Sequence, residues 1–155
     1  MVDSGDNKKM FGTVFRILDE KNRIVLPPAF RDELEGDFYI SANLEKILEI
    51  RSQTEFDIIA QKIGKANSLD PRLRDFARYF FGNTVKVSVD KQGRFLIPKN
   101  LLDLAAVKKR IYLLGVNNKI EIWPEERYDQ FFAKFSDSDV TADLEKELLK
   151  SGVEL

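Results

Sequence analysis

Hydrophobic and polar positions alternate in short runs over most of the chain, which is typical of strands that bury one face. These runs predict four short strands, at residues 14–18, 24–26, 85–89 and 95–97. A polar turn joins the strands of each pair, and its Asn22 or Gly93 is the residue type that most readily adopts a positive φ. Pro27 and Pro98 end the second strand of each pair, because proline has no N–H for a strand ladder.

Further along each half, apolar runs on either side of polar turns predict two hairpins. They comprise residues 38–41 with 47–51, and residues 111–115 with 119–123, the second turning at Asn117 and Asn118. Short helices are expected directly after the two prolines, at residues 28–34 and 99–105, with Gly36 ending the first.

Longer helices have clearer signals. Ser52 and Glu55 have the spacing of a capping box. An apolar face then follows at i, i+3, i+4 and i+7, formed by Phe56, Ile59, Ala60 and Ile63. Because Ala60 is small, we expect a bulky residue from elsewhere to pack over it.

Two more helices are expected. One begins at Asp70 and Pro71, ends at Gly82 and Asn83, and buries a stripe of Leu73, Phe76, Ala77 and Phe80. The other begins at Pro124, with Glu125 and Glu126 near its positive end. We interpret the aromatic stripes of all these helices as core. The acidic segment 136–155 favours a short helix around residues 144–149.

The chain repeats itself. Asp19-Glu-Lys-Asn-Arg23-Ile-Val-Leu-Pro27 returns as Asp90-Lys-Gln-Gly-Arg94-Phe-Leu-Ile-Pro98, at an offset of 71. Later the offset becomes 72, where the helix face described above matches Tyr128, Phe131, Phe132 and Phe135. We therefore expect a disordered leader at 1–9, one unit at 10–65, a connecting helix at 66–81, a second unit at 82–135 and an acidic tail at 136–155.

Composition narrows the chemistry. Among 155 residues there is no Cys and no His, which excludes disulfides, Cys/His zinc sites, Cys nucleophiles and Ser-His-Asp triads. No apolar run approaches the length of a membrane-spanning helix and no signal peptide opens the chain, so we expect a cytoplasmic protein without a cofactor. Residues 8–110 carry 20 Lys and Arg against 14 Asp and Glu, whereas residues 111–155 carry 5 against 10. A basic body weakly favours a polyanionic partner.

The repeated Asp-x-x-x-Arg turns are the strongest candidates for chemistry. In one interpretation, Asp and Arg only form an ion pair that fixes each turn. In the other, Arg23 and Arg94 contact a phosphate or a guanine edge, and Asp19 and Asp90 orient them. Neighbouring cations support the second interpretation, and we add four of them to the candidate DNA-binding set: Arg16, Lys21, Lys86 and Lys91.

Two other classes of function stay open at this point. Asp19 and Asp90 could form an acid–base pair of an enzyme, but no histidine and no glycine-rich phosphate loop accompany them. An assembly protein is also compatible with the sequence, with Trp123, Phe80 and Phe81 as interface anchors.

The chain resembles the MraZ family, a family of bacterial transcriptional regulators. The resemblance covers residues 10–135 and lies in Met10-Phe-Gly-Thr-Val-Phe15, in Asp19 to Pro27 with Pro-Ala-Phe30-Arg31, in the second copy Asp90 to Pro98, and in Glu121-Ile-Trp123. Asn22 stands where the family usually has Gly, and Leu102 where the second unit often has Arg.

The resemblance implies a mainly β fold with helices (α+β), in which two AbrB-like swapped-hairpin units form an interleaved β-barrel with helices packed outside. It implies a ring-shaped homo-oligomer that binds double-stranded DNA through Asp19, Arg23, Asp90 and Arg94. The sites are short direct repeats upstream of the protein's own gene, which usually opens the division and cell-wall gene cluster. A nucleoid-associated protein or a ring-forming assembly protein without a specific operator is the alternative. The resemblance implies no enzyme, metal, membrane or small-molecule substrate.

Overall fold

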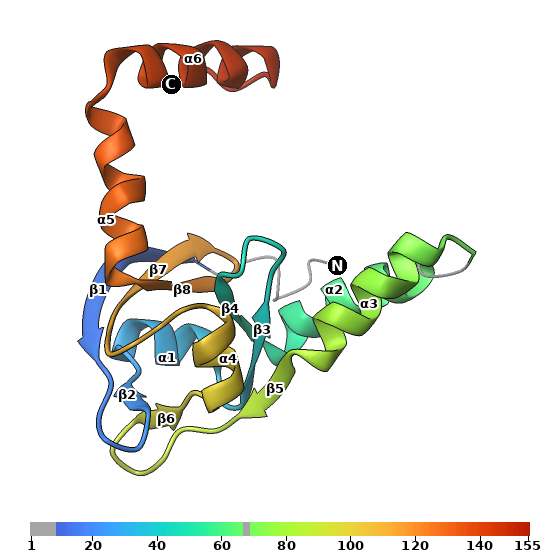
Figure 1. Ribbon diagram of the computed structural model, residues 1–155, viewed down its shortest axis with the longest axis vertical. Coiled ribbons are helices and arrows are strands. Elements are labelled where there is room, and N and C mark those ends of the chain that lie inside the picture. Colours follow the sequence, from blue (N-terminus) through green and yellow to red (C-terminus); the bar gives the residue numbers. More distant parts are fainter. Residues whose placement is uncertain (1–8, 67–68) are drawn as a thin grey trace. The chain divides into compact units, whose positions relative to one another are not determined.

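The computed structural model describes residues 9–66 and 69–155 and divides the chain into two compact units, Met1–Pro124 and Glu125–Leu155 (Figure 1). The expected leader at 1–9 lies outside the described residues except for Lys9, which is exposed. The expected mixed α+β class is confirmed. No helix in the described part of the chain is both long and apolar enough to span a membrane.

The described residues of the first unit form eight strands and four helices. In chain order they are β1 (Met10–Ile17), β2 (Arg23–Val25), α1 (Pro28–Leu34), β3 (Phe38–Ala42), β4 (Leu48–Ser52), α2 (Gln53–Ala66), α3 (Pro71–Gly82), β5 (Thr84–Val87), β6 (Arg94–Leu96), α4 (Lys99–Leu104), β7 (Arg110–Asn117) and β8 (Ile120–Pro124). The second unit contains α5 (Glu125–Ala133), a short 3₁₀ helix η2 (Lys134–Ser136) and α6 (Ser138–Lys150).

Both sheets of the first unit are antiparallel and draw strands from both repeats. The larger has the order β1-β7-β8-β4-β3-β5, and the smaller pairs β2 with β6. Exchanging each strand for its counterpart in the other repeat reverses the larger order and returns the same sheet. The repeats are therefore related by a pseudo-twofold axis, which passes through the pairs Ile24↔Phe95 and Glu49↔Glu121.

Strand pairing across the repeats stops short of a closed barrel. In the described residues, β1 and β5 are the two ends of the larger sheet, and β2 and β6 form a separate ribbon. The interleaved barrel implied by the family resemblance therefore stays a prediction.

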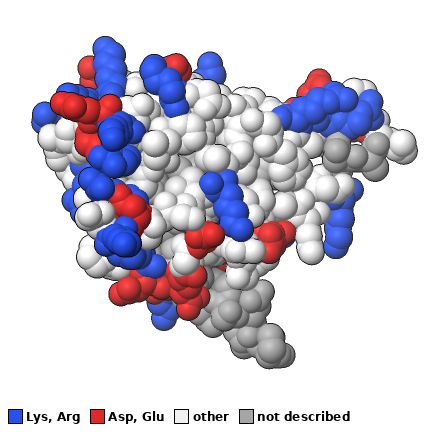
Figure 2. Space-filling model, turned by 90° about the horizontal axis from the view of Figure 1, so that it is seen from below, with Lys and Arg blue, Asp and Glu red and all other residues white. Residues whose placement is uncertain are grey.

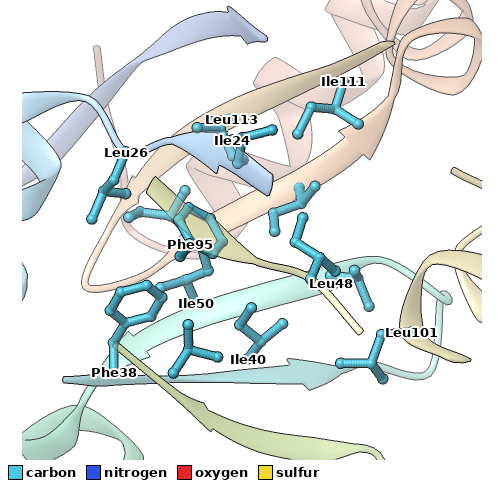
Figure 3. Packing of buried hydrophobic residues seen from close by; sticks show 14 of the residues in the cluster. Ile24, Leu26, Phe38, Ile40, Leu48, Ile50, Phe95, Leu101, Ile111 and Leu113 are labelled. Carbon is cyan, nitrogen blue, oxygen red and sulfur yellow. The ribbon is translucent and has the colours of Figure 1, made fainter. Parts of the chain in front are cut away.

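The main core lies between the ribbon and the larger sheet (Figure 3). Ile24 of β2 and Phe95 of β6 are almost fully buried there, together with Ile40, Leu48 and Ile50. The Phe95 ring meets the ring of Phe38 edge to face, with centroids 5.2 Å apart. One continuous core thus contains side chains from both copies of the repeat, so neither copy has a complete core of its own.

A buried ion pair also joins the repeats near the axis. Glu49 of β4 is only 4% exposed. Its carboxylate lies 2.5 Å from Lys119 Nζ and 2.9 Å from Arg51 Nη1, and it accepts a hydrogen bond from Asn43 Nδ2. Lys119 belongs to the second repeat, so this contact ties the two hairpins together on the face of the larger sheet opposite the main core.

Helices α2 and α3 form a second cluster of apolar residues. Phe56 stacks between Tyr39, at a centroid distance of 4.1 Å, and Phe80, at 6.2 Å. The expected capping bond is present, because Ser52 Oγ accepts from the backbone N–H of Glu55. Ala60 packs at the edge of this cluster. The expectation that a bulky residue packs over Ala60 stays a prediction.

Several details of the sequence prediction are wrong. Leu73 is 41% exposed rather than buried, because it lies outside the α2–α3 contact. Pro124 ends β8, and α5 begins one residue later, at Glu125. Phe132 of α5 and Phe135 of η2 are 62% and 45% exposed, so this part of the expected aromatic stripe is not core. The expected short C-terminal helix is the longer α6.

The close approach of β1 and β7 gives a test of the strand pairing across the repeats. A Cβ on Gly115 would lie 2.5 Å from the carbonyl carbon of Met10 and 2.6 Å from the backbone nitrogen of Phe11. We expect Gly115→Ala to force the two strands apart and to lower the free energy of unfolding by about 1–3 kcal/mol. Gly64→Ala in α2, where the added Cβ meets nothing within 4 Å, should instead be neutral or stabilising by up to about 1 kcal/mol. Urea denaturation measures both, and equal stability of the two variants would contradict this pairing.

Candidate nucleic-acid interface

The Asp19 carboxylate organises the first turn with both of its oxygens. Oδ1 accepts the backbone N–H groups of Lys21 and Arg23, each at 2.9 Å. Oδ2 accepts a hydrogen bond from Arg23 Nε at 2.8 Å. Asn22 closes the turn with a φ of 61°, as the sequence predicted. One carboxylate thus fixes the turn and orients the arginine at the same time.

The second turn repeats this arrangement atom for atom. Asp90 Oδ1 accepts the backbone N–H groups of Gln92 and Arg94 at 2.9 Å, and its Oδ2 accepts from Arg94 Nε at 2.8 Å. Gly93 takes the left-handed position with a φ of 76°. The two interpretations of the Asp–Arg spacing are therefore compatible, because turn fixation uses one oxygen and the arginine uses the other.

Both turn aspartates are held in their ionised form. The hydrogen bond from the Arg23 backbone N–H is the main reason that the pKa of Asp19 lies below its ordinary value of 3.8. The Arg94 backbone N–H lowers the pKa of Asp90 in the same way. Stability linked to these groups is present above the pKa of the unfolded chain and is lost as the pH falls below it.

Hydrogen bonds between the repeats place each turn beside the other strand. The backbone N–H of Leu26 donates to Gly93 O at 2.9 Å, and that of Ile97 donates to Asn22 O at 3.0 Å. The two turns consequently lie at the same end of the unit, next to β2 and β6 (Figure 1).

The ribbon presents both arginines on one face. Ile24 and Phe95 point into the core, and side chains alternate along a strand. Arg23 and Arg94 therefore point outward together, with side chains 27% and 31% exposed. In the register of the ribbon, Arg23 lies opposite Leu96 and Arg94 lies opposite Val25. Sequence spacing predicted that Arg23 and Arg94 lie on two separate exposed turns. The pairing of β2 with β6 places both arginines on one surface.

The four additional cations are placed differently. Lys21 and Lys91 are exposed in the two turns. Arg16 donates from Nε to Val25 O at 2.9 Å and from Nη1 to Phe15 O at 3.1 Å, so it ties β1 to the ribbon. Lys86 is exposed on β5, opposite Tyr39, at the far end of the larger sheet from β1. The structure brings three of these cations to the ribbon, and no described contact brings Lys86 there.

Arg31 also lies beside the candidate interface, although the candidate set did not include it. It belongs to α1 of the first repeat, yet its Nη1 lies so near the second turn that a Cβ on Gly93 would be 3.2 Å away. Its counterpart in the second repeat, Leu102, is buried in the core. In the sequence, the sign of this difference is that position 31 carries a charged arginine, whereas the equivalent position 102 carries a leucine. Lys and Arg gather over the side of the unit where β1, β2 and β6 lie, with Asp and Glu among them (Figure 2).

A metal site and a catalytic acid–base pair have little support in the described residues. They contain no group of three or more carboxylates that could hold a metal ion. An acid–base pair of Asp19 and Asp90 is disfavoured, because each carboxylate is bound to its own arginine and its pKa is lowered, whereas a general acid needs a raised one.

Comparison with known proteins gives a consistent result. The family model described as "MraZ protein, putative antitoxin-like" matches the chain twice, at residues 10–79 and 80–151. The transcriptional regulator MraZ of Mesomycoplasma hyopneumoniae (strain 7448) is 88% identical over 146 residues, which is 94% of this chain and 100% of that protein. Proteins of the same name from Mycoplasmopsis pulmonis and Clostridium acetobutylicum are 42% and 36% identical, over 94% and 84% of this chain and 98% and 92% of their own lengths.

The two tasks of the turn carboxylate can be separated by substitution. We expect Asp19→Asn to keep an oxygen for the backbone N–H groups and to lose the ion pair with Arg23, whereas Asp19→Ala loses both. The melting temperature at pH 7 should therefore fall in the order parent, Asn variant, Ala variant. The difference between the parent and Asp19→Asn should shrink as the pH is lowered below about 4, because the unfolded chain binds a proton there and the folded protein binds one only at the lower pKa of Asp19. Asp75→Asn, which removes only the exposed pair with Arg78, is the control and should change little. Equal melting temperatures for the two Asp19 variants would contradict the turn-fixing role.

Proposed function

Because the chain belongs to the MraZ family of transcriptional regulators, we propose that it binds double-stranded DNA in a sequence-specific way through the paired Asp-x-x-x-Arg turns. The observation that supports this most is the common outward face of Arg23 and Arg94, each held by an aspartate through Nε. An arginine held in this way has its terminal amino groups directed by the protein rather than by solvent, which suits a planar partner such as a guanine edge.

The ribbon also has a shape that DNA accepts. A two-stranded antiparallel ribbon fits the major groove of B-DNA, where the base edges differ most from one another. With β2 and β6 in the groove, Arg23 and Arg94 contact bases or phosphates, and Lys21 and Lys91 in the flanking turns contact the backbone on either side. Arg16 supports the ribbon from β1, and Lys86 adds charge at a distance.

We further propose that several subunits act together, as the family resemblance implies. One ribbon offers few phosphate contacts and binds weakly by itself. A closed ring of subunits presents many ribbons, so that short direct repeats are engaged one after another and later contacts become intramolecular. The proposed targets are the protein's own promoter and the division and cell-wall gene cluster, and the proposed location is the cytoplasm, at the nucleoid. We also propose that the strands of units 10–65 and 82–135 are interleaved in the swapped-hairpin manner that the family resemblance implies.

The second compact unit supports assembly. None of the residues of α5, η2 and α6 is buried, although α6 has an apolar side. Six large apolar side chains there are more than 40% exposed: Phe132, Phe135, Leu144, Leu149, Val153 and Leu155. So much apolar surface on a small unit is typical of a surface that another chain covers. We assign the covering chain to a second copy of this protein, since the proposed array needs such a contact.

The competing function is a nucleoid-associated or ring-forming assembly protein without a specific operator. It shares the basic ribbon and the exposed apolar side chains, and it differs in having no preference among DNA sequences. Binding to the protein's own upstream DNA and to a random duplex of equal length separates the two functions.

The arginines are the first test of DNA binding. We expect Arg23→Ala and Arg94→Ala each to weaken binding to the protein's own upstream DNA by about 5- to 150-fold in a gel-shift assay, because each bidentate base contact contributes about 1–3 kcal/mol. Arg78→Ala removes the same charge from α3, away from the ribbon, and should bind like the parent. Parental binding by both ribbon variants would overturn the proposal.

The dependence of DNA affinity on salt concentration gives an independent test of DNA binding. Parental binding should fall by orders of magnitude between about 50 and 200 mM salt if several ribbons neutralise phosphates together. A flat salt response would indicate a partner other than DNA.

Assembly can be tested on the second unit. We expect Leu149→Asp combined with Phe132→Ser to reduce the oligomer mass measured by light scattering, because charged and polar groups replace apolar surface that a second copy covers. Thr54→Asp, an exposed change on α2, is the control. An unchanged mass with parental thermal stability would place the subunit contact elsewhere.

A further inference from the structure

The outward face of the β2–β6 ribbon contains two aliphatic side chains that neither the core nor the ion pairs use. Val25 is 43% exposed and Leu96 is 49% exposed. Their neighbours on the same strands, Ile24 and Phe95, are buried almost completely. Val25 and Leu96 occupy equivalent positions in the two repeats, 71 residues apart, so this exposure occurs twice in the same structural setting.

The strand register fixes how these side chains lie relative to the arginines. Arg23 pairs with Leu96, and Val25 pairs with Arg94. Residues that face each other across an antiparallel pair lie on the same side of the sheet, as do residues two apart on one strand. The four side chains therefore form a square patch in which the two arginines occupy one diagonal and the two aliphatic residues occupy the other.

Aliphatic groups in such a patch suit one feature of DNA. Of the groups that base pairs present in the major groove, the C5-methyl of thymine is the apolar one, and small aliphatic side chains contact it directly. The flanking guanidinium groups supply the charge that draws the patch to a polyanion. Lysine or glutamine at positions 25 and 96 would make this surface more soluble, and either would be equally compatible with an outward strand position.

We propose that Val25 and Leu96 are specificity-determining residues that contact thymine methyl groups in the major groove, between the base or phosphate contacts of Arg23 and Arg94. This inference rests on the proposed function, because it requires the ribbon to bind DNA. The arginines supply affinity and recognise polar edges. The aliphatic pair discriminates thymine from cytosine at the adjoining positions.

The test removes the methyl group from either side of the contact. Three duplexes are compared by gel shift: the protein's own upstream DNA, the same DNA with deoxyuridine in place of thymidine, and a random duplex. The proteins are the parent, Val25→Ala, Leu96→Ala and Leu44→Ala. Leu44 is a matched control, because it is a 72% exposed leucine on the turn between β3 and β4, away from the ribbon.

The parent and Leu44→Ala should lose about fourfold in affinity per methyl contact on the uracil-containing upstream DNA, the effect of burying about one methylene-sized group. Val25→Ala and Leu96→Ala should bind thymine-containing upstream DNA more weakly and should respond less to the loss of the methyl groups. Their affinity for the random duplex should match that of the parent.

Different failures have different meanings. If the parent prefers its upstream DNA and is equally tight on the uracil-containing duplex, the role of Val25 and Leu96 is overturned and the proposed function stands. The same holds if both ribbon variants respond to methyl loss as strongly as the parent does. If no protein distinguishes upstream from random DNA, the sequence-specific function itself fails, and this inference fails with it.

Discussion

The burial of Ile24 against Phe95, across the pseudo-twofold axis, is the interaction on which the candidate interface depends. Side chains alternate along a strand, so fixing these two residues in the core fixes the opposite direction for Arg23 and Arg94. A slip of one residue in the pairing would exchange core and surface, placing guanidinium groups in an apolar interior. Hydrophobic packing therefore determines where the charged groups point, and the aspartates only adjust how each arginine is held once it is outside.

The two repeats have diverged where they contact other elements. In the first, the apolar face of α2 is covered by α3, and the aromatic rings of Phe56 and Phe80 stack in the contact. In the second, α5 is followed by η2 and α6, and large apolar groups stay exposed. The turns, by contrast, have kept the same hydrogen bonds. Local geometry is thus retained at the ribbon, while the helices of the two halves have taken different roles.

Much of the local structure could be predicted from sequence, because it depends on neighbouring residues. Asn22 and Gly93 predicted the left-handed turn positions, and proline and helical spacing predicted α1 and α2. The pairing of β1 with β7 could not be derived in this way, because periodicity identifies a strand without identifying its partner. Phe132 and Leu73 show the same limit on helices, since an apolar spacing indicates a face to be covered but not what covers it. Arg16 stays a candidate DNA contact, and sequence spacing alone did not indicate that its Nε and Nη1 donate to backbone carbonyls.

The pairing of β1 with β7, from Met10↔Asn117 to Ile17↔Arg110, has a consequence for protein synthesis. The ribosome makes β1 well before β7, because most of the first unit lies between them in the sequence. Until β7 is made, β1 has no partner strand, and the apolar side of the first hairpin is not covered. Folding of this unit must therefore wait until β7 has been synthesised. A product of premature termination, ending anywhere before β7, would present bare strand edges suited to aggregation and to quality-control proteolysis.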